Sequence, residues 1–152
     1  MGIRLKAIVV YLSTSGNTKA MAEAIANGIE SKNVDAKAVS FYDVNVEDLK
    51  EADAIAVGSS TFYYKMLAPM EKFMNETLAS IDPAGKLGAA FGSYGWSGEA
   101  PILIAEKMRD MGMNVIDPVL RILHKPTDKD LQECKRLGVD IAEKLKHGSK
   151  KT

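Results

Sequence analysis

Cysteine and histidine are scarce in this chain, and their scarcity argues against two kinds of stabilising chemistry. The 152 residues include one cysteine, Cys134, and two histidines, His124 and His147. One cysteine cannot form an internal disulfide, and the two histidines add no cluster with the spacing of metal ligands. We therefore expect neither a disulfide nor a metal site, as is typical of proteins from the reducing cytoplasm.

Net charge and long apolar runs are also lacking. Lysine and arginine together number 20, as do aspartate and glutamate, so the formal net charge is zero. Nucleic-acid-binding domains need a basic surface, which this composition does not supply. No stretch approaches the roughly 20 apolar residues of a membrane span, and the first residues lack the length and flanks of a signal peptide. We expect a cytoplasmic protein with no nucleic-acid partner and no membrane span.

The sequence does contain a regular alternation of β-type runs with amphipathic helical segments. Residues 5–11 are almost continuously aliphatic, as expected of a strand covered on both faces. The pattern comprises five strand segments (5–11, 36–40, 54–58, 87–92 and one within 115–123) and four helical segments (20–29, 69–81, 101–111 and 127–145). Because right-handed crossovers place helices on both faces, strict alternation predicts a doubly wound, five-stranded parallel α/β sheet. The length suits a single domain over residues 1–152.

Ligands of doubly wound sheets bind beyond the carboxyl ends of the strands, so the segments that follow the strands are candidate site residues. The first such segment is Ser13-Thr14-Ser15-Gly16-Asn17-Thr18, which leads into a helix. Hydroxyl and amide groups at a helix N-terminus can hold a phosphate without a cationic side chain. The segment has neither the Gly-Lys pattern of a Walker loop nor the three glycines of a dinucleotide fold. The alternative is a hydroxyl-rich turn that only caps the helix.

The second and third segments are rich in aromatic residues. The third strand is followed by Ser59-Ser60-Thr61-Phe62-Tyr63-Tyr64-Lys65-Met66-Leu67. The fourth ends in Gly92-Ser93-Tyr94-Gly95-Trp96-Ser97-Gly98. Aromatic residues on loops suit contact with a flat ligand, and the three glycines let the backbone approach that ligand closely. The alternatives are that the aromatic side chains cover the sheet edge and that Trp96 belongs to the core. A phosphate end and an aromatic end at one site match the shape of FMN.

The same residues carry a resemblance to a known family. Residues 13–18 resemble the phosphate-binding loop of flavodoxins, and residues 92–98 are similar to the third flavin loop of the flavodoxin domain in flavodiiron proteins. The resemblance implies the sheet order 2-1-3-4-5 and FMN as the cofactor. It also implies a non-enzymatic electron carrier that shuttles electrons between protein redox partners, as a monomer or a weak dimer.

The resemblance also implies a role for each loop. The phosphate would be held by Ser13, Ser15, Asn17 and Thr18, with Thr14 and Gly16 contributing mainly backbone amides. The ribityl or pyrimidine side would be served by Ser60 and Thr61, with Phe62 and Tyr63 near the ring. The third loop would offer the amides of Ser93, Tyr94 and Gly95 to the pyrimidine carbonyls, with Tyr94 or Trp96 beside the ring and Gly98 in the same loop.

Three departures from the family pattern stand out. The cluster of metal ligands found in flavodiiron proteins is missing, so we expect no oxygen or nitric oxide reduction at iron. Many flavodoxins are strongly acidic, whereas this chain is neutral. No glycine occurs between Gly58 and Gly85, so a peptide flip in the second loop would strain a bulky residue such as Phe62 or Tyr63.

Two other functions use a similar scaffold. A flavodoxin-like NAD(P)H:quinone or FMN reductase is the main alternative, although short loops leave little material for a substrate pocket. A receiver-type regulatory domain needs an acidic pair after the first strand, where this chain has Leu12 and Ser13. We interpret Cys134 as a core residue and neither His124 nor His147 as part of a site.

Overall fold

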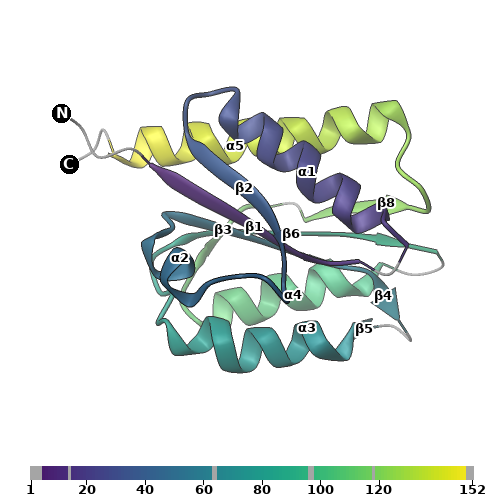
Figure 1. Ribbon diagram of the computed structural model, residues 1–152, viewed down its shortest axis with the longest axis horizontal. Helices are drawn as coiled ribbons and strands as arrows, with labels where there is room; N and C mark the ends of the chain where they lie inside the picture. Colours follow the sequence, from purple (N-terminus) through teal and green to yellow (C-terminus); the bar gives the residue numbers. More distant parts are fainter. Residues whose placement is uncertain (1–4, 14, 63–64, 96–97, 118, 150–152) are drawn as a thin grey trace.

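The chain folds into a three-layer structure in which one parallel sheet lies between two layers of helices (Figure 1). The computed structural model describes residues 5–13, 15–62, 65–95, 98–117 and 119–149. The strand order is β2 (Asp35–Ser40), β1 (Lys6–Leu12), β3 (Ala54–Ser59) and β6 (Leu87–Tyr94), followed by the short strands β7 (Asn114–Val115) and β8 (Leu120–Leu123), which both pair with β6. All these pairings are parallel, so the predicted order 2-1-3-4-5 is confirmed.

Helices cover both faces of the sheet, as predicted. In Figure 1, α1 (Asn17–Glu30) and α5 (Asp128–Ser149) lie on one face, and α4 (Glu99–Asp110) lies on the other beside α3 (Ala68–Lys72). The helix that begins as α3 continues directly into a π-helical turn, η1 (Phe73–Leu78). The helices cross over between parallel strands and thereby bring all the strand ends of one kind to the same edge of the sheet.

The side chains of the central strand alternate between two cores. Ala7 and Val9 of β1 belong to the cluster beneath α1 and α5, whereas Ile8 and Val10 belong to the cluster beneath α3 and α4. All four are buried, because successive side chains of a strand point to opposite faces and both faces are covered here. The centre of the aliphatic run, residues 7–10, is therefore enclosed on both faces.

The predicted set of helices and strands was incomplete in two places. The helix α2 (Val46–Glu51) lies between β2 and β3, where no helix was expected, and its six residues are too few to show a helical period. The second loop contains a small antiparallel pair, β4 (Thr61–Phe62) and β5 (Lys65–Met66), rather than irregular chain alone. The fifth strand is divided into β7 and β8, in agreement with the interruption that Pro118 suggests; Pro118 itself lies outside the described residues.

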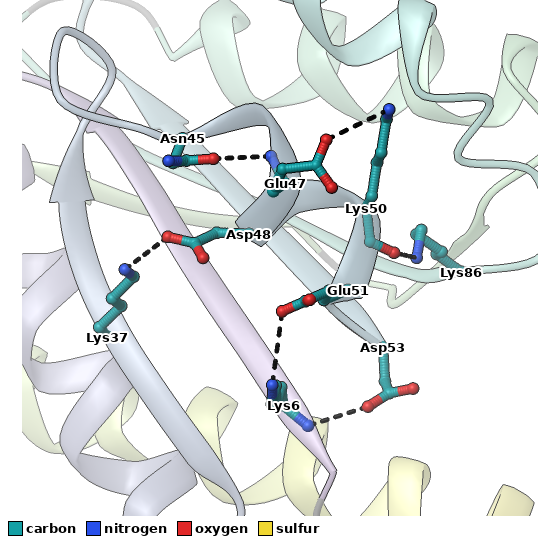
Figure 2. A network of polar contacts seen from close by, with 9 residues as sticks. All are labelled: Lys6, Lys37, Asn45, Glu47, Asp48, Lys50, Glu51, Asp53 and Lys86. Carbon is teal, nitrogen blue, oxygen red and sulfur yellow. Dashed lines mark hydrogen bonds and ion pairs between the residues drawn. The ribbon is translucent and has the colours of Figure 1, made fainter.

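Polar contacts hold α2 against the amino ends of the strands (Figure 2). Asn45 caps this helix, since its Oδ1 accepts the Glu47 N–H at 2.8 Å. Lys37 of β2 forms an ion pair with Asp48 at 2.7 Å, and the ammonium group of Lys6 lies 3.5 Å from Glu51. These side chains are exposed, so each pair contributes about 0–1 kcal/mol. The network lies at the amino ends of β1 and β2, opposite the edge where the strands end.

Candidate functional site

The carboxyl ends of β1, β3 and β6 meet around a polar cleft of about 210 Å³. The parallel register sets Leu12 of β1 beside Ser59 of β3 and so brings the first and second loops together. The lining residues come from the three predicted loops and from the end of β8, and they are Ser15, Asn17, Ser60, Thr61, Ser93, Tyr94, Gly95 and His124. All of these except His124 are residues that the sequence predicts for the cofactor site.

A separate hollow of about 310 Å³ lies at the amino ends of β1 and β2. Its lining includes the ion-paired side chains of Lys6, Lys37, Asp48 and Glu51, which are those of Figure 2. Ligands of doubly wound sheets bind at the opposite, carboxyl edge. The cleft at the carboxyl ends of β1, β3 and β6 is therefore the candidate site.

The first loop presents the beginning of α1 to the cleft. Gly16 is the N-cap of this helix, with a φ of +88°, and no atom lies within 4 Å of the position that a Cβ would take there. The Ser13 hydroxyl accepts the Gly16 N–H at 3.0 Å, which closes the turn. The first turn of α1 contains no acidic residue. Its backbone N–H groups and the positive end of the helix dipole are therefore suited to an anion.

Thr18 lies deeper than the other predicted phosphate ligands. Its side chain is fully buried, and its hydroxyl lies 2.8 Å from the Ser93 hydroxyl and 3.2 Å from the Ser60 hydroxyl. These contacts join one residue from each of the three loops. Thr18 thus lies in the first turn of α1, and its hydroxyl connects the three loops to one another.

The second loop is fixed by two hydroxyl groups. Ser59 donates to the Ser60 carbonyl at 3.0 Å and accepts the Leu67 N–H at 3.3 Å. Thr61 accepts the Ala100 N–H at 3.0 Å, so a side chain of the second loop caps the helix α4 that follows the third. Tyr63 and the side chain of Phe62 lie outside the described residues, as do Thr14 and Trp96, and their roles stay predictions.

The glycines of the third loop differ in the space around them. A Cβ on Gly92 would lie 2.1 Å from the carbonyl oxygen of Ser59, so Gly92 permits close packing between β6 and β3. A Cβ on Gly95 would meet nothing nearer than 3.9 Å, and Gly95 is exposed at the cleft. The predicted site residue Gly98 is buried against Tyr94 and Arg121 and does not line the cleft.

His124 is the lining residue that the sequence interpretation missed. It follows β8, adopts a φ of +60°, and donates its backbone N–H to the Tyr94 carbonyl at 2.6 Å. Its exposed ring borders the cleft beside Gly95. Its position just after a strand was visible in the sequence, whereas the turn that directs it toward the third loop was not.

The described cleft fits the polar part of FMN. Uncharged hydroxyl and amide groups beside the first turn of α1 are a donor set suited to phosphate. At about 210 Å³ the cleft is smaller than the roughly 300–1,000 Å³ of typical ligand pockets, so these residues account for part of the molecule.

In the described ranges, no three His, Cys, Asp or Glu side chains gather as a metal site would require. Within the same ranges, no helix combines the length and the apolar character needed to cross a bilayer.

A doubly wound parallel sheet with a hydroxyl-lined cleft beyond β1, β3 and β6 defines a flavodoxin-like α/β protein. The family model for flavodoxin matches residues 9–138, and the chain belongs to the flavodoxin family. Flavodoxins bind FMN and transfer electrons to protein partners.

Individual relatives agree with this assignment. A solved flavodoxin from the domain Archaea is 83% identical, with a TM-score of 0.93 over 94% of this chain and 100% of that one. The flavodoxin of Clostridium beijerinckii is 34% identical over 88% of this chain and 97% of its own length. The flavodiiron core of a Synechocystis protein is 33% identical over 95% of this chain and 36% of that one, with a TM-score of 0.83. The chain spans a quarter to a third of the length of the first curated relatives that it matches.

Proposed function

We propose that residues 1–152 form a single FMN domain that carries electrons one at a time between protein partners in the cytoplasm, as a monomer or a weak dimer. The observation that carries this proposal is the polar cleft at the strand ends, where the open N-terminus of α1 meets the second and third loops. FMN supplies the redox chemistry when it is bound. The protein binds it, orients it and sets the free energy of each charge state.

The first loop is the proposed phosphate site. Ser15 and Asn17 line the cleft, and the amides of the first turn of α1 stand behind them. Ser13 and Gly16 shape the turn through their hydrogen bond, and Thr18 ties it to the other loops. Thr14 is assigned to the same loop by its position in the sequence. A phosphate held here is stabilised by backbone donors and by the helix dipole rather than by a cation.

The second and third loops are the proposed flavin side of the site. Ser60 and Thr61 line the cleft together with Ser93, Tyr94 and Gly95, and the open space at Gly95 allows a ligand to approach the backbone. The proposal keeps the predicted aromatic contacts of Phe62, Tyr63 and Trp96. It assigns Gly98 a supporting role beneath Tyr94. The reductase alternative has no specific observation in its favour.

The experiment is the absorption spectrum of the purified protein, with and without added FMN. We expect one FMN per chain, and photoreduction in two separate one-electron stages. A protein that binds no FMN contradicts the proposal. Steady NADPH oxidation with a quinone, or reduction in one two-electron stage, favours the reductase instead.

The variant Asn17→Asp tests whether the FMN phosphate binds at the first turn of α1. A negative charge in the first turn of α1 interacts favourably with the helix dipole, so the variant keeps its fold. The same charge repels a phosphate dianion. We expect weaker binding of FMN and nearly unchanged binding of riboflavin, which lacks the phosphate. Asn75→Asp, an exposed position in η1, makes the same chemical change away from the cleft and is the matched control.

A further inference from the structure

His124 holds a conformation that few residues other than glycine adopt. Its φ of +60° lies in the left-handed region, where Asn, Asp and His are the commoner non-glycine residues. The preceding residue, Leu123, still pairs with Tyr94 in the sheet, and the His124 N–H then donates to the Tyr94 carbonyl at 2.6 Å. The chain therefore turns at His124 directly beside the third loop.

This turn brings the imidazole to the wall of the cleft. Both Cε1 and Nδ1 lie 3.9 Å from the position that a Cβ on Gly95 would take. The other described lining side chains are hydroxyl, phenol or amide groups, from Ser15, Asn17, Ser60, Thr61, Ser93 and Tyr94. Among them His124 is the one with a basic side chain, and it stands on the side of Tyr94 and Gly95 rather than at the first turn of α1.

We propose that the His124 imidazole is an additional flavin-binding group, which donates a hydrogen bond to the pyrimidine edge of the bound ring. The proposal rests on the proposed function, since it requires FMN in this cleft. A donor at that edge stabilises negative charge that develops on the ring during reduction. The His124 side chain therefore strengthens binding of the flavin, and it strengthens binding of the reduced form most.

Two substitutions separate the ring from the backbone turn. Asparagine tolerates the left-handed conformation, so His124→Asn keeps the turn and removes the imidazole. A β-branched residue does not, so His124→Val strains the turn as well. We expect His124→Asn to melt within a few degrees of the wild type and His124→Val to melt clearly lower. If His124→Asn melts lower than expected, His124→Gly, in which this conformation costs nothing, replaces it in the binding experiment.

The binding experiment compares FMN with riboflavin by quenching of flavin fluorescence. For His124→Asn we expect about a tenfold weaker affinity for both ligands, as the loss of one hydrogen bond implies, and a lower midpoint potential of the bound flavin. His147→Asn, at the other histidine, is the matched control and leaves both affinities unchanged. In the ¹H NMR spectrum, riboflavin shifts the Cε1–H resonance of His124 and not that of His147.

The outcomes separate this proposal from the function on which it rests. Wild-type affinity of His124→Asn for both ligands overturns the proposal, because the ring then makes no contact. A loss confined to FMN also overturns it, because the imidazole then serves the phosphate. A wild-type protein that binds neither ligand contradicts the proposed function itself.

Discussion

The hydroxyl of Thr18 lies 2.8 Å from the hydroxyl of Ser93, in a position where both side chains are buried. The two residues are 75 positions apart in the sequence and belong to the first and third loops. Because Ser60 is also within 3.2 Å of Thr18, the pair forms the centre of a small hydroxyl cluster. The loops of the cleft are thus connected to one another through side-chain hydroxyl groups.

Removal of this central hydroxyl tests the connection. Thr18→Val keeps the shape of the side chain and leaves the Ser93 hydroxyl without its partner, so we expect the free energy of unfolding to fall by about 1–2 kcal/mol. Thr18→Ser retains the hydroxyl and is the control. Urea denaturation of Thr18→Val, Ser93→Ala and the double variant measures the coupling, which we expect near 1 kcal/mol. Strictly additive effects would contradict a direct interaction.

Gly92 and Gly95 provide a second test, because alanine fits at one and not at the other. Gly92→Ala places a Cβ 2.1 Å from the Ser59 carbonyl oxygen, so β6 and β3 must separate, and we expect a loss of about 2–3 kcal/mol in stability. Gly95→Ala meets no atom within 3.9 Å and should fold normally. Thermal melting of the ligand-free proteins distinguishes the two. Weaker FMN binding by the folded Gly95→Ala variant would show close approach of the ligand at this backbone.

The contact between Thr61 and Ala100 predicts that the second loop stabilises α4. Thr61→Val removes the acceptor for the Ala100 N–H at 3.0 Å, and we expect a loss of about 1 kcal/mol, as for other helix caps. Thr61→Ser keeps the acceptor and serves as the control. Hydrogen exchange followed residue by residue should show faster exchange in the first turn of α4. Unchanged exchange there would mean that the cap contributes nothing.

Burial of Cys134 predicts both its reactivity and a pH effect. Burial, followed by the nearby charges of Asp130 and Glu133, raises the pKa of the Cys134 thiol from 9.0 to about 12. The folded protein should therefore resist thiol reagents at pH 8 and react only in urea.

The same pKa sets the sign of the pH dependence. Between pH 9 and pH 12 the folded chain keeps a proton that the unfolded chain releases. Stability therefore falls with rising pH in this window, by up to about 1.4 kcal/mol per pH unit. Cys134→Ala removes this contribution, so its unfolding free energy should fall less steeply between pH 9 and pH 11. Equal slopes for the two proteins would contradict it.

Most of the sheet could be predicted from the sequence because its central strands are enclosed on both faces. The run at residues 5–11 has almost no polar interruption, and the runs at 54–58 and 87–92, which form β3 and β6, are similarly apolar. The helix α2 could not be predicted in this way, since it buries one side chain, Leu49, and depends on its Asn45 cap and on exposed ion pairs.

The candidate site likewise contains residues that could be predicted from the sequence and residues that could not. Residues of the first loop could be predicted, because hydroxyl groups before a helix have a local physical meaning. The buried contacts of Thr18 and the position of His124 could not, because they depend on which strands lie side by side and on a backbone turn at a residue other than glycine. The alternation of strands and helices predicts that these loops share one edge of the sheet, but not which of their side chains points inward.

The division of the fifth strand into β7 and β8 has a consequence for association between molecules. An edge strand offers unpaired backbone groups to any other strand of similar length. Here that edge consists of a two-residue and a four-residue piece, with Pro118 between them in the sequence. A second chain finds no long continuous ladder to extend along β7 and β8. The division of this edge into two short strands therefore protects the sheet against aggregation along β7 and β8.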